Sequence, residues 1–132
     1  MNDSTVAATV LVVEDDPLFL TLLCRMVEEL GYQVGATASD GSDAVVLCRS
    51  IQPDLVLMDM MMPGLNGMDA ATIIQNEQDV PIVLVSGLRI DDVSGRATRA
   101  PSGFLRKPFT LGELGAVLAD HLDSGELQAA GR

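Results

Sequence analysis

Short, unbroken apolar runs are the feature of this chain that most limits how it can fold. Residues 9–13 read TVLVV, residues 55–58 read LVLM and residues 80–85 read VPIVLV, and polar or turn-forming residues follow each run. A run of this length without polar alternation is typical of a strand buried on both faces of a parallel sheet. The three runs therefore predict a parallel sheet with helices on both sides.

The segments between these runs have helical patterns. Apolar residues recur at helical spacing from Leu18 to Leu30, and Gly31 follows as a stop. Asp16 is suited to cap this helix, with Pro17 at its first position. Further helices are expected at 41–50, at 66–76 and from Thr110 to Leu122, and weaker strands at 32–38 and 103–106.

Residues 90–100 are the ambiguous part of the chain. Asp91, Asp92 and Arg96 are compatible with a helix, but Gly95 and the following Pro101 weaken it. We expect a short or mobile helix here. The complete order is strand then helix five times over, which predicts a doubly wound (βα)5 five-stranded parallel sheet with right-handed crossovers.

The length of 132 residues fits one domain. We expect this domain over residues 9–123, after an N-terminal extension over 1–8. Residues 124–132 are polar and contain two glycines, so they predict a frayed tail or the beginning of a linker. Cys24 and Cys48 lie in helical patterns without a C-x-x-C spacing, which indicates reduced thiols in the core.

The charge balance excludes several classes of partner. The formal net charge is −11, and no basic stripe or aromatic platform is present, which argues against direct binding of nucleic acid. Residues 1–8 lack the pattern of a signal peptide, and no apolar stretch approaches the length of a membrane span. We therefore expect a soluble, cytoplasmic protein with no membrane partner.

Polar residues gather where the predicted strands end. Glu14 and Asp15 follow the first strand, Asp59 the third, Ser86 the fourth and Lys107 the fifth. Because parallel strands place their carboxyl ends at one edge of the sheet, these side chains should meet there. Three clustered carboxylates raise one another's pKa unless a cation lies among them, and a carboxylate-lined site suits Mg²⁺.

Each of these residues also has an ordinary structural explanation. A lysine is usually a solvated surface residue, a Ser-Gly pair commonly forms a turn, and acids often precede a helix because its dipole favours them. Their joint occurrence at one sheet edge favours a functional site. A carboxylate nucleophile, Mg²⁺ and a lysine are what phosphoryl transfer to an aspartate requires.

Four motifs carry a family resemblance. VLVVEDDP, PDLVLMDMMMPGLNG, VPIVLVSG and FLRKPF together resemble the receiver domain of bacterial two-component response regulators, from Val10 to Leu122. The resemblance implies a flavodoxin-like receiver fold. The chain departs from the usual pattern at residues 100–103, where APSG replaces a small residue, a glycine and an acid.

The resemblance implies a role for each residue at the metal site. Asp59 corresponds to the phospho-acceptor, which also binds the metal. Asp15 corresponds to the direct carboxylate ligand, and Glu14 to an outer acid that acts through a metal-bound water. The backbone carbonyl of Met61 corresponds to the main-chain ligand. Mg²⁺ is the implied cofactor, and Mn²⁺ can substitute.

Further residues correspond to the switch of the family. Ser86 matches the hydroxyl that bonds the phosphoryl group, and Lys107 the phosphate-pairing lysine, with a cis peptide bond before Pro108. Phe104 matches the switch aromatic. Met61 and Leu88 stand where the family tunes hydrolysis of the acyl phosphate, and two apolar side chains there predict a long-lived phosphoryl state.

The implied function is that of a signalling domain rather than an enzyme with a separate substrate. A sensor histidine kinase or histidine phosphotransfer protein would supply the phosphoryl group, and the domain would assist its own phosphorylation and dephosphorylation. The fourth helix, fifth strand and fifth helix would form the output surface for a protein target that the sequence does not identify.

Two other functions are compatible with such a fold. A phosphorylation-independent pseudo-receiver would act as an interaction module, although Asp59, Asp15 and Lys107 are all present. A flavin-binding electron carrier would need aromatic residues to stack on the ring. This chain has no Trp, one Tyr and acids in the first loop.

Overall fold

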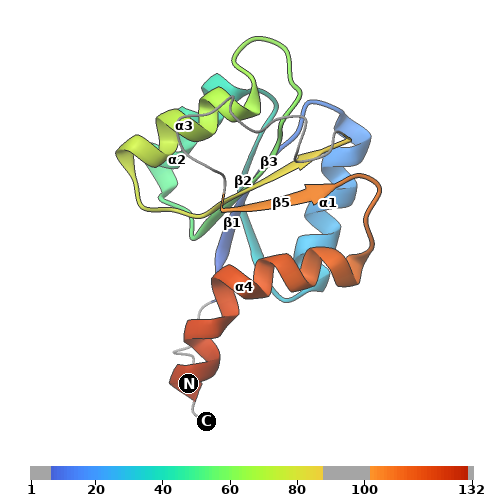
Figure 1. Cartoon of the computed structure of the whole chain (residues 1–132), viewed down its shortest axis with the longest axis vertical. Helices are drawn as coiled ribbons and strands as arrows, with labels where there is room; N and C mark the ends of the chain where they lie inside the picture. Colours follow the sequence, from blue (N-terminus) through green and yellow to red (C-terminus); the bar gives the residue numbers. More distant parts are fainter. Residues whose placement is uncertain (1–6, 88–101, 131–132) are drawn as a thin grey trace.

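Five parallel strands form a single sheet in the order β2-β1-β3-β4-β5. The structure is a computed structural model that describes residues 7–87 and 102–130. The strands are β1 (Thr9–Val13), β2 (Gln33–Ala38), β3 (Leu55–Asp59), β4 (Ile82–Ser86) and β5 (Gly103–Arg106). The described helices are α1 (Pro17–Glu29), α2 (Gly41–Ile51), α3 (Gly67–Glu77) and α4 (Leu111–Ala130). The predicted doubly wound parallel fold is confirmed (Figure 1).

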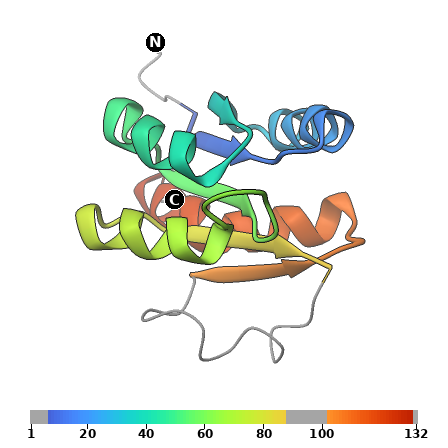
Figure 2. The same cartoon turned by 90° about the horizontal axis from the view of Figure 1, so that it is seen from above.

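Helices cover both faces of the sheet. Figures 1 and 2 show α2 and α3 together on one side, with α1 and α4 on the other. Successive residues of a strand point to opposite faces. In β1, Leu11 and Val13 accordingly belong to the core under α2 and α3, whereas Val10 and Val12 belong to the core under α1 and α4. Burial on both faces explains the unbroken apolar runs.

The central strands lie deepest in the molecule. All five residues of β3 and all five of β4 are buried, including the polar residue at the end of each strand. Strand β3 lies between β1 and β4, so its carboxyl end is in the middle of the row formed by the carboxyl ends of the five strands. That position places Asp59 between the ends of the two neighbouring strands.

Side-chain caps determine where the helices begin. Asp16 caps α1 by accepting from the Leu18 N–H at 3.0 Å, with Pro17 as the first helical residue. Thr110 and Glu113 form the predicted capping box, in which each side chain accepts from the other residue's backbone N–H. Helix α1 ends before Gly31, whose φ of 97° is a conformation that glycine adopts at low cost.

One prediction about secondary structure is wrong. Helix α4 continues to Ala130, although the apolar periodicity predicted that the last helix ends at Leu122. A single glycine at 125 costs about 1 kcal/mol and does not stop a helix, and the residues after it are good helix formers. The division into a domain over 9–123 and a tail stays a prediction.

The remaining expectations concern residues 90–100, the two cysteines and membrane-spanning segments. The helix expected at 90–100 lies outside the described residues. Cys24 and Cys48 are both free thiols, Cys48 buried and Cys24 half-buried. Across the surface of α2 and α3, Arg49 donates two hydrogen bonds to Glu77, at 2.9 and 2.7 Å. No helix in the described part of the chain is both long and apolar enough to cross a membrane.

Candidate functional site

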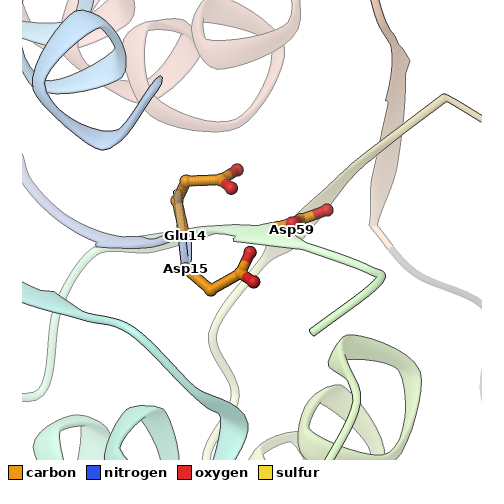
Figure 3. A group of neighbouring side chains, drawn as sticks. All are labelled: Glu14, Asp15 and Asp59. Atoms are coloured by element: carbon orange, nitrogen blue, oxygen red, sulfur yellow. The ribbon is translucent and has the colours of Figure 1, made fainter. Parts of the chain in front are cut away.

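Three carboxylates meet at the carboxyl edge of the sheet. Glu14 follows β1, Asp15 comes next, and Asp59 is the last residue of β3. One carboxylate oxygen from each lies within 4.8 Å of the others. In Figure 3 the carboxylates of Glu14 and Asp15 both extend toward the side where Asp59 lies. The predicted convergence of these acids is therefore confirmed.

The three acids differ in exposure. Glu14 is 2% exposed and Asp59 4% exposed, whereas Asp15 is open to solvent. Burial is the main cause that raises the pKa of Glu14 to about 7, and the nearby Asp59 carboxylate adds to it. Burial also raises the pKa of Asp59, although Lys107 and the Met61 N–H act in the opposite direction. Ionising both buried carboxylates at once is therefore unfavourable unless a cation lies close to them.

Lys107 brings a positive charge to this edge. Its Nζ lies 3.6 Å from Glu14 Oε1 and 3.9 Å from Asp59 Oδ1. The same ammonium lies over the ring of Phe19, 4.5 Å from the ring centroid. Phe19 in turn meets Phe109 edge to face, with centroids 6.1 Å apart. Lys107 thus lies between two carboxylates and an aromatic face.

Backbone hydrogen bonds attach the site to the sheet. The Glu14 N–H donates to Ala38 O at 3.0 Å, the Met60 N–H to Val85 O at 2.9 Å, and the Lys107 N–H to Ser86 O at 2.8 Å. The pairing between strands thus continues one residue beyond β1, β3 and β5. These bonds fix the backbone from which the functional side chains extend.

The carboxylate oxygens of the site are suitable ligands for a divalent cation. Glu14 Oε2 accepts from the Asp16 N–H at 3.1 Å, but Glu14 Oε1 is buried without a hydrogen-bond partner in the described structure. The Lys107 ammonium lies 3.6 Å from this oxygen, but one ammonium balances only one of the three clustered carboxylates, so a further cation would be favourable there. Hard oxygen ligands with excess negative charge are what Mg²⁺ binds in proteins.

The other predicted site residues have different positions. Ser86 ends β4 and is 1% exposed, and Phe104 is a half-buried residue of β5 that packs against the core under α2 and α3. Met61 is 60% exposed, and its N–H donates to Asp59 Oδ1 at 3.2 Å. The peptide bond before Pro108 is cis. Leu88 lies outside the described residues.

Sequence reasoning missed the contact between Phe19 and Lys107. The periodicity of α1 assigned Phe19 to the apolar stripe, and it does pack with the core under α1 and α4. The available signal was its place in the first turn of the helix that follows β1. A residue there lies close to the ends of the neighbouring strands in a parallel α/β sheet.

Comparison with known proteins agrees with this arrangement. The family model described as "Response regulator receiver domain" matches residues 10–119. The chain belongs to the response regulator receiver domain family. It is 38% identical over 113 residues to the transcriptional regulatory protein PdtaR of Mycobacterium tuberculosis, an alignment that covers 85% of this chain and 55% of that protein. This receiver domain therefore spans about half the length of that relative.

Solved structures show the same fold. The signal receiver domain of the putative response regulator NarL from Mycobacterium tuberculosis matches with a TM-score of 0.82 and 28% identity, covering 97% of this chain and all of that one. The receiver domain of the sensor histidine kinase PA1611 from Pseudomonas aeruginosa matches with a TM-score of 0.80 and 30% identity, covering 90% and 100%. That protein has a magnesium ion coordinated in its active site cleft.

These findings place the chain among the signalling domains of two-component systems. The predicted family is confirmed. Family membership does not test the roles assigned to individual residues, which stay predictions.

Proposed function

We propose that this receiver domain accepts a phosphoryl group on Asp59 from a phospho-histidine of a sensor histidine kinase or a histidine phosphotransfer protein. The main support for this proposal is the environment of the Asp59 carboxylate. It is buried, lies 3.9 Å from the Lys107 ammonium and has two further carboxylates beside it. A nucleophilic carboxylate with positive charge close by is what aspartyl phosphorylation needs.

The residues of the chain divide the work of the transfer. An Asp59 carboxylate oxygen bonds to phosphorus as the bond from phosphorus to the donor histidine nitrogen breaks, and that nitrogen keeps the electron pair. Lys107 pairs with the phosphoryl oxygens. Asp15, Asp59, the Met61 carbonyl and, through water, Glu14 would hold Mg²⁺ or Mn²⁺. When bound, the cation supplies positive charge against the phosphoryl oxygens.

The switch follows from binding the phosphoryl group more tightly in one conformer than in another. The Ser86 hydroxyl would bond the new phosphoryl oxygens, and Phe104 would fill the space that Ser86 leaves. Only such a difference in affinity shifts the population of conformers. The output surface would comprise β5, α4 and residues 90–100, and it would meet a protein target.

Phosphate incorporation tests the proposal. Purified protein is incubated with acetyl phosphate, with and without Mg²⁺, and hydroxylamine-sensitive phosphate is measured. Wild type should incorporate phosphate only with Mg²⁺, and Asp59→Asn should not. Asp16→Asn is the matched control because it makes the same chemical change beside the site and keeps a good helix cap.

The pseudo-receiver is the alternative outcome of this test. A wild-type protein that takes no phosphate from acetyl phosphate is next given its cognate phosphorylated sensor kinase or histidine phosphotransfer protein. If that donor also fails, the proposal is wrong and the domain is an interaction module.

The lifetime of the phosphoryl group is a second part of the proposal. Met61 is a large exposed apolar side chain two residues after Asp59. Together with Leu88 it would hinder the approach of water to the acyl phosphate. Replacing both by small polar residues should therefore speed dephosphorylation, and an unchanged rate would contradict this reasoning.

A further inference from the structure

The contact between Phe19 and Lys107 joins two parts of the chain at the site. Phe19 belongs to the first turns of α1, whereas Lys107 and Phe109 belong to the connection between β5 and α4. The Lys107 ammonium lies 4.5 Å from the Phe19 centroid, a distance at which a cation is attracted by the face of an aromatic ring. Phe109 meets the Phe19 ring at an interplanar angle of 67° and so supports its orientation.

The ring holds the ammonium where the reaction needs it. Lys107 Nζ is already 3.9 Å from Asp59 Oδ1 while it lies over Phe19. A phosphoryl group on Asp59 would therefore come within reach of the ammonium without loss of the ring contact. A long, flexible lysine side chain loses conformational freedom when it is held in one place, and a contact that holds it beforehand reduces this cost at the moment of reaction.

We propose that Phe19 is a positioning residue for Lys107: the face of its ring keeps the ammonium beside Asp59, and so speeds phosphorylation. The proposal rests on the proposed function, since it assigns Lys107 to the phosphoryl group. It differs from a purely structural role, in which Phe19 only fills space in the core under α1 and α4. The two explanations make different predictions for the electronic character of the ring.

Nuclear magnetic resonance of the lysine side chain tests the contact itself. Lys107 is the only lysine in the sequence, so ¹³C-lysine labelling gives one set of side-chain signals. In wild type the ε-protons should be shifted upfield by the ring current of Phe19. The shift should be lost in Phe19→Leu and kept in Phe19→Tyr. An unshifted signal in wild type, or a shift that survives in Phe19→Leu, would overturn the proposal.

The control for packing lies on the same helix. Leu20 packs against the same core as Phe19. Leu20→Ala should therefore lower stability but leave the lysine signal shifted. Loss of the shift in this variant would show that the lysine responds to general loosening of α1, which contradicts a specific contact with Phe19.

Phosphorylation kinetics test the consequence for the reaction. With acetyl phosphate and Mg²⁺, Phe19→Leu should reduce the rate constant about fivefold, the size expected from one cation–π contact. Phe19→Tyr should restore most of the rate. Phenylalanine analogues with one, two and three ring fluorines at position 19 should lower the rate stepwise, because fluorine weakens the negative ring face with little change in size.

The outcomes separate the two proposals. Equal rates across the fluorinated series overturn the role of Phe19 and leave Asp59 phosphorylation intact. A wild type that incorporates no phosphate from either donor overturns the proposed function, and with it the role of Phe19 in the reaction. The lysine signal then still decides whether Phe19 positions the ammonium.

Discussion

Replacing Glu14 by glutamine should stabilise the protein at high pH and not at low pH. Glu14 is 2% exposed, and one of its oxygens is buried without a hydrogen bond in the described structure. Glutamine keeps the shape and an oxygen that can accept from the Asp16 N–H. It removes the buried negative charge, so the expected gain is the cost of that charge.

The size of the effect follows from the pKa of Glu14, which burial raises from 4.5 to about 7. At about 1.4 kcal/mol per pH unit, this difference corresponds to about 3 kcal/mol. The folded protein holds this proton more tightly than the unfolded chain does. The wild-type free energy of unfolding is therefore highest below pH 4.5 and falls as the pH rises through about 7. The pKa of about 7 already includes the attraction of the Lys107 ammonium, which acts to lower it, so the ion pair that the variant loses is contained in the figure of about 3 kcal/mol.

Urea denaturation followed by circular dichroism measures the effect, in the presence of EDTA at pH 5 and pH 8. The variant should be the more stable protein at pH 8, with a much smaller difference at pH 5. Glu29→Gln makes the same chemical change at an exposed position of α1 and is the control. A difference between Glu14→Gln and wild type that is equal at both pH values would refute the reasoning.

Four further predictions concern the metal, one helix cap and the packing, and their magnitudes are changes in the free energy of unfolding. Adding Mg²⁺ at about 100 times its dissociation constant should raise wild-type stability by about 2.7 kcal/mol in the same denaturation assay at pH 8, and EDTA should reverse the gain; no gain would contradict a metal site. Gly67→Ala should destabilise by about 1–3 kcal/mol in urea, because its Cβ would lie 2.7 Å from Met60 Cα, and an unchanged midpoint would show that the loop adapts freely. Thr110→Ala should cost about 1 kcal/mol, measured in the same way, because the Glu113 N–H loses its acceptor, whereas Thr110→Ser should cost little. Leu57→Ala should cost about 2–5 kcal/mol, since the side chain is fully buried in β3, and a loss below 1 kcal/mol would mean that the core closes around the cavity.

The strands were predictable because burial on both faces leaves a direct mark on the sequence. The runs at 10–13 and 55–58 have no polar residue, and both lie within strands. The meeting of Glu14, Asp15 and Asp59 was also predictable, because parallel strands end at one edge. These features depend only on the direction and order of the strands.

Other features depend on three-dimensional detail that the sequence pattern does not contain. The pattern put Phe19 in the core stripe of α1, and only the approach of the connection after β5 brings Lys107 over its ring. The difference between buried Glu14 and exposed Asp15 is likewise a matter of side-chain direction. The end of α4 was misjudged because apolar periodicity stops at Leu122 while helix propensity continues.

The hydrogen bonds that continue the sheet beyond its strands have a consequence for amide exchange. The N–H groups of Glu14, Met60 and Lys107 each donate to a carbonyl of the adjoining strand segment. They can exchange with deuterium only when the sheet edge itself opens, so their protection should approach that of the central strands. The backbone that carries the site should thus remain protected while the domain switches. Changes in exchange on phosphorylation should appear in the loops around this protected edge.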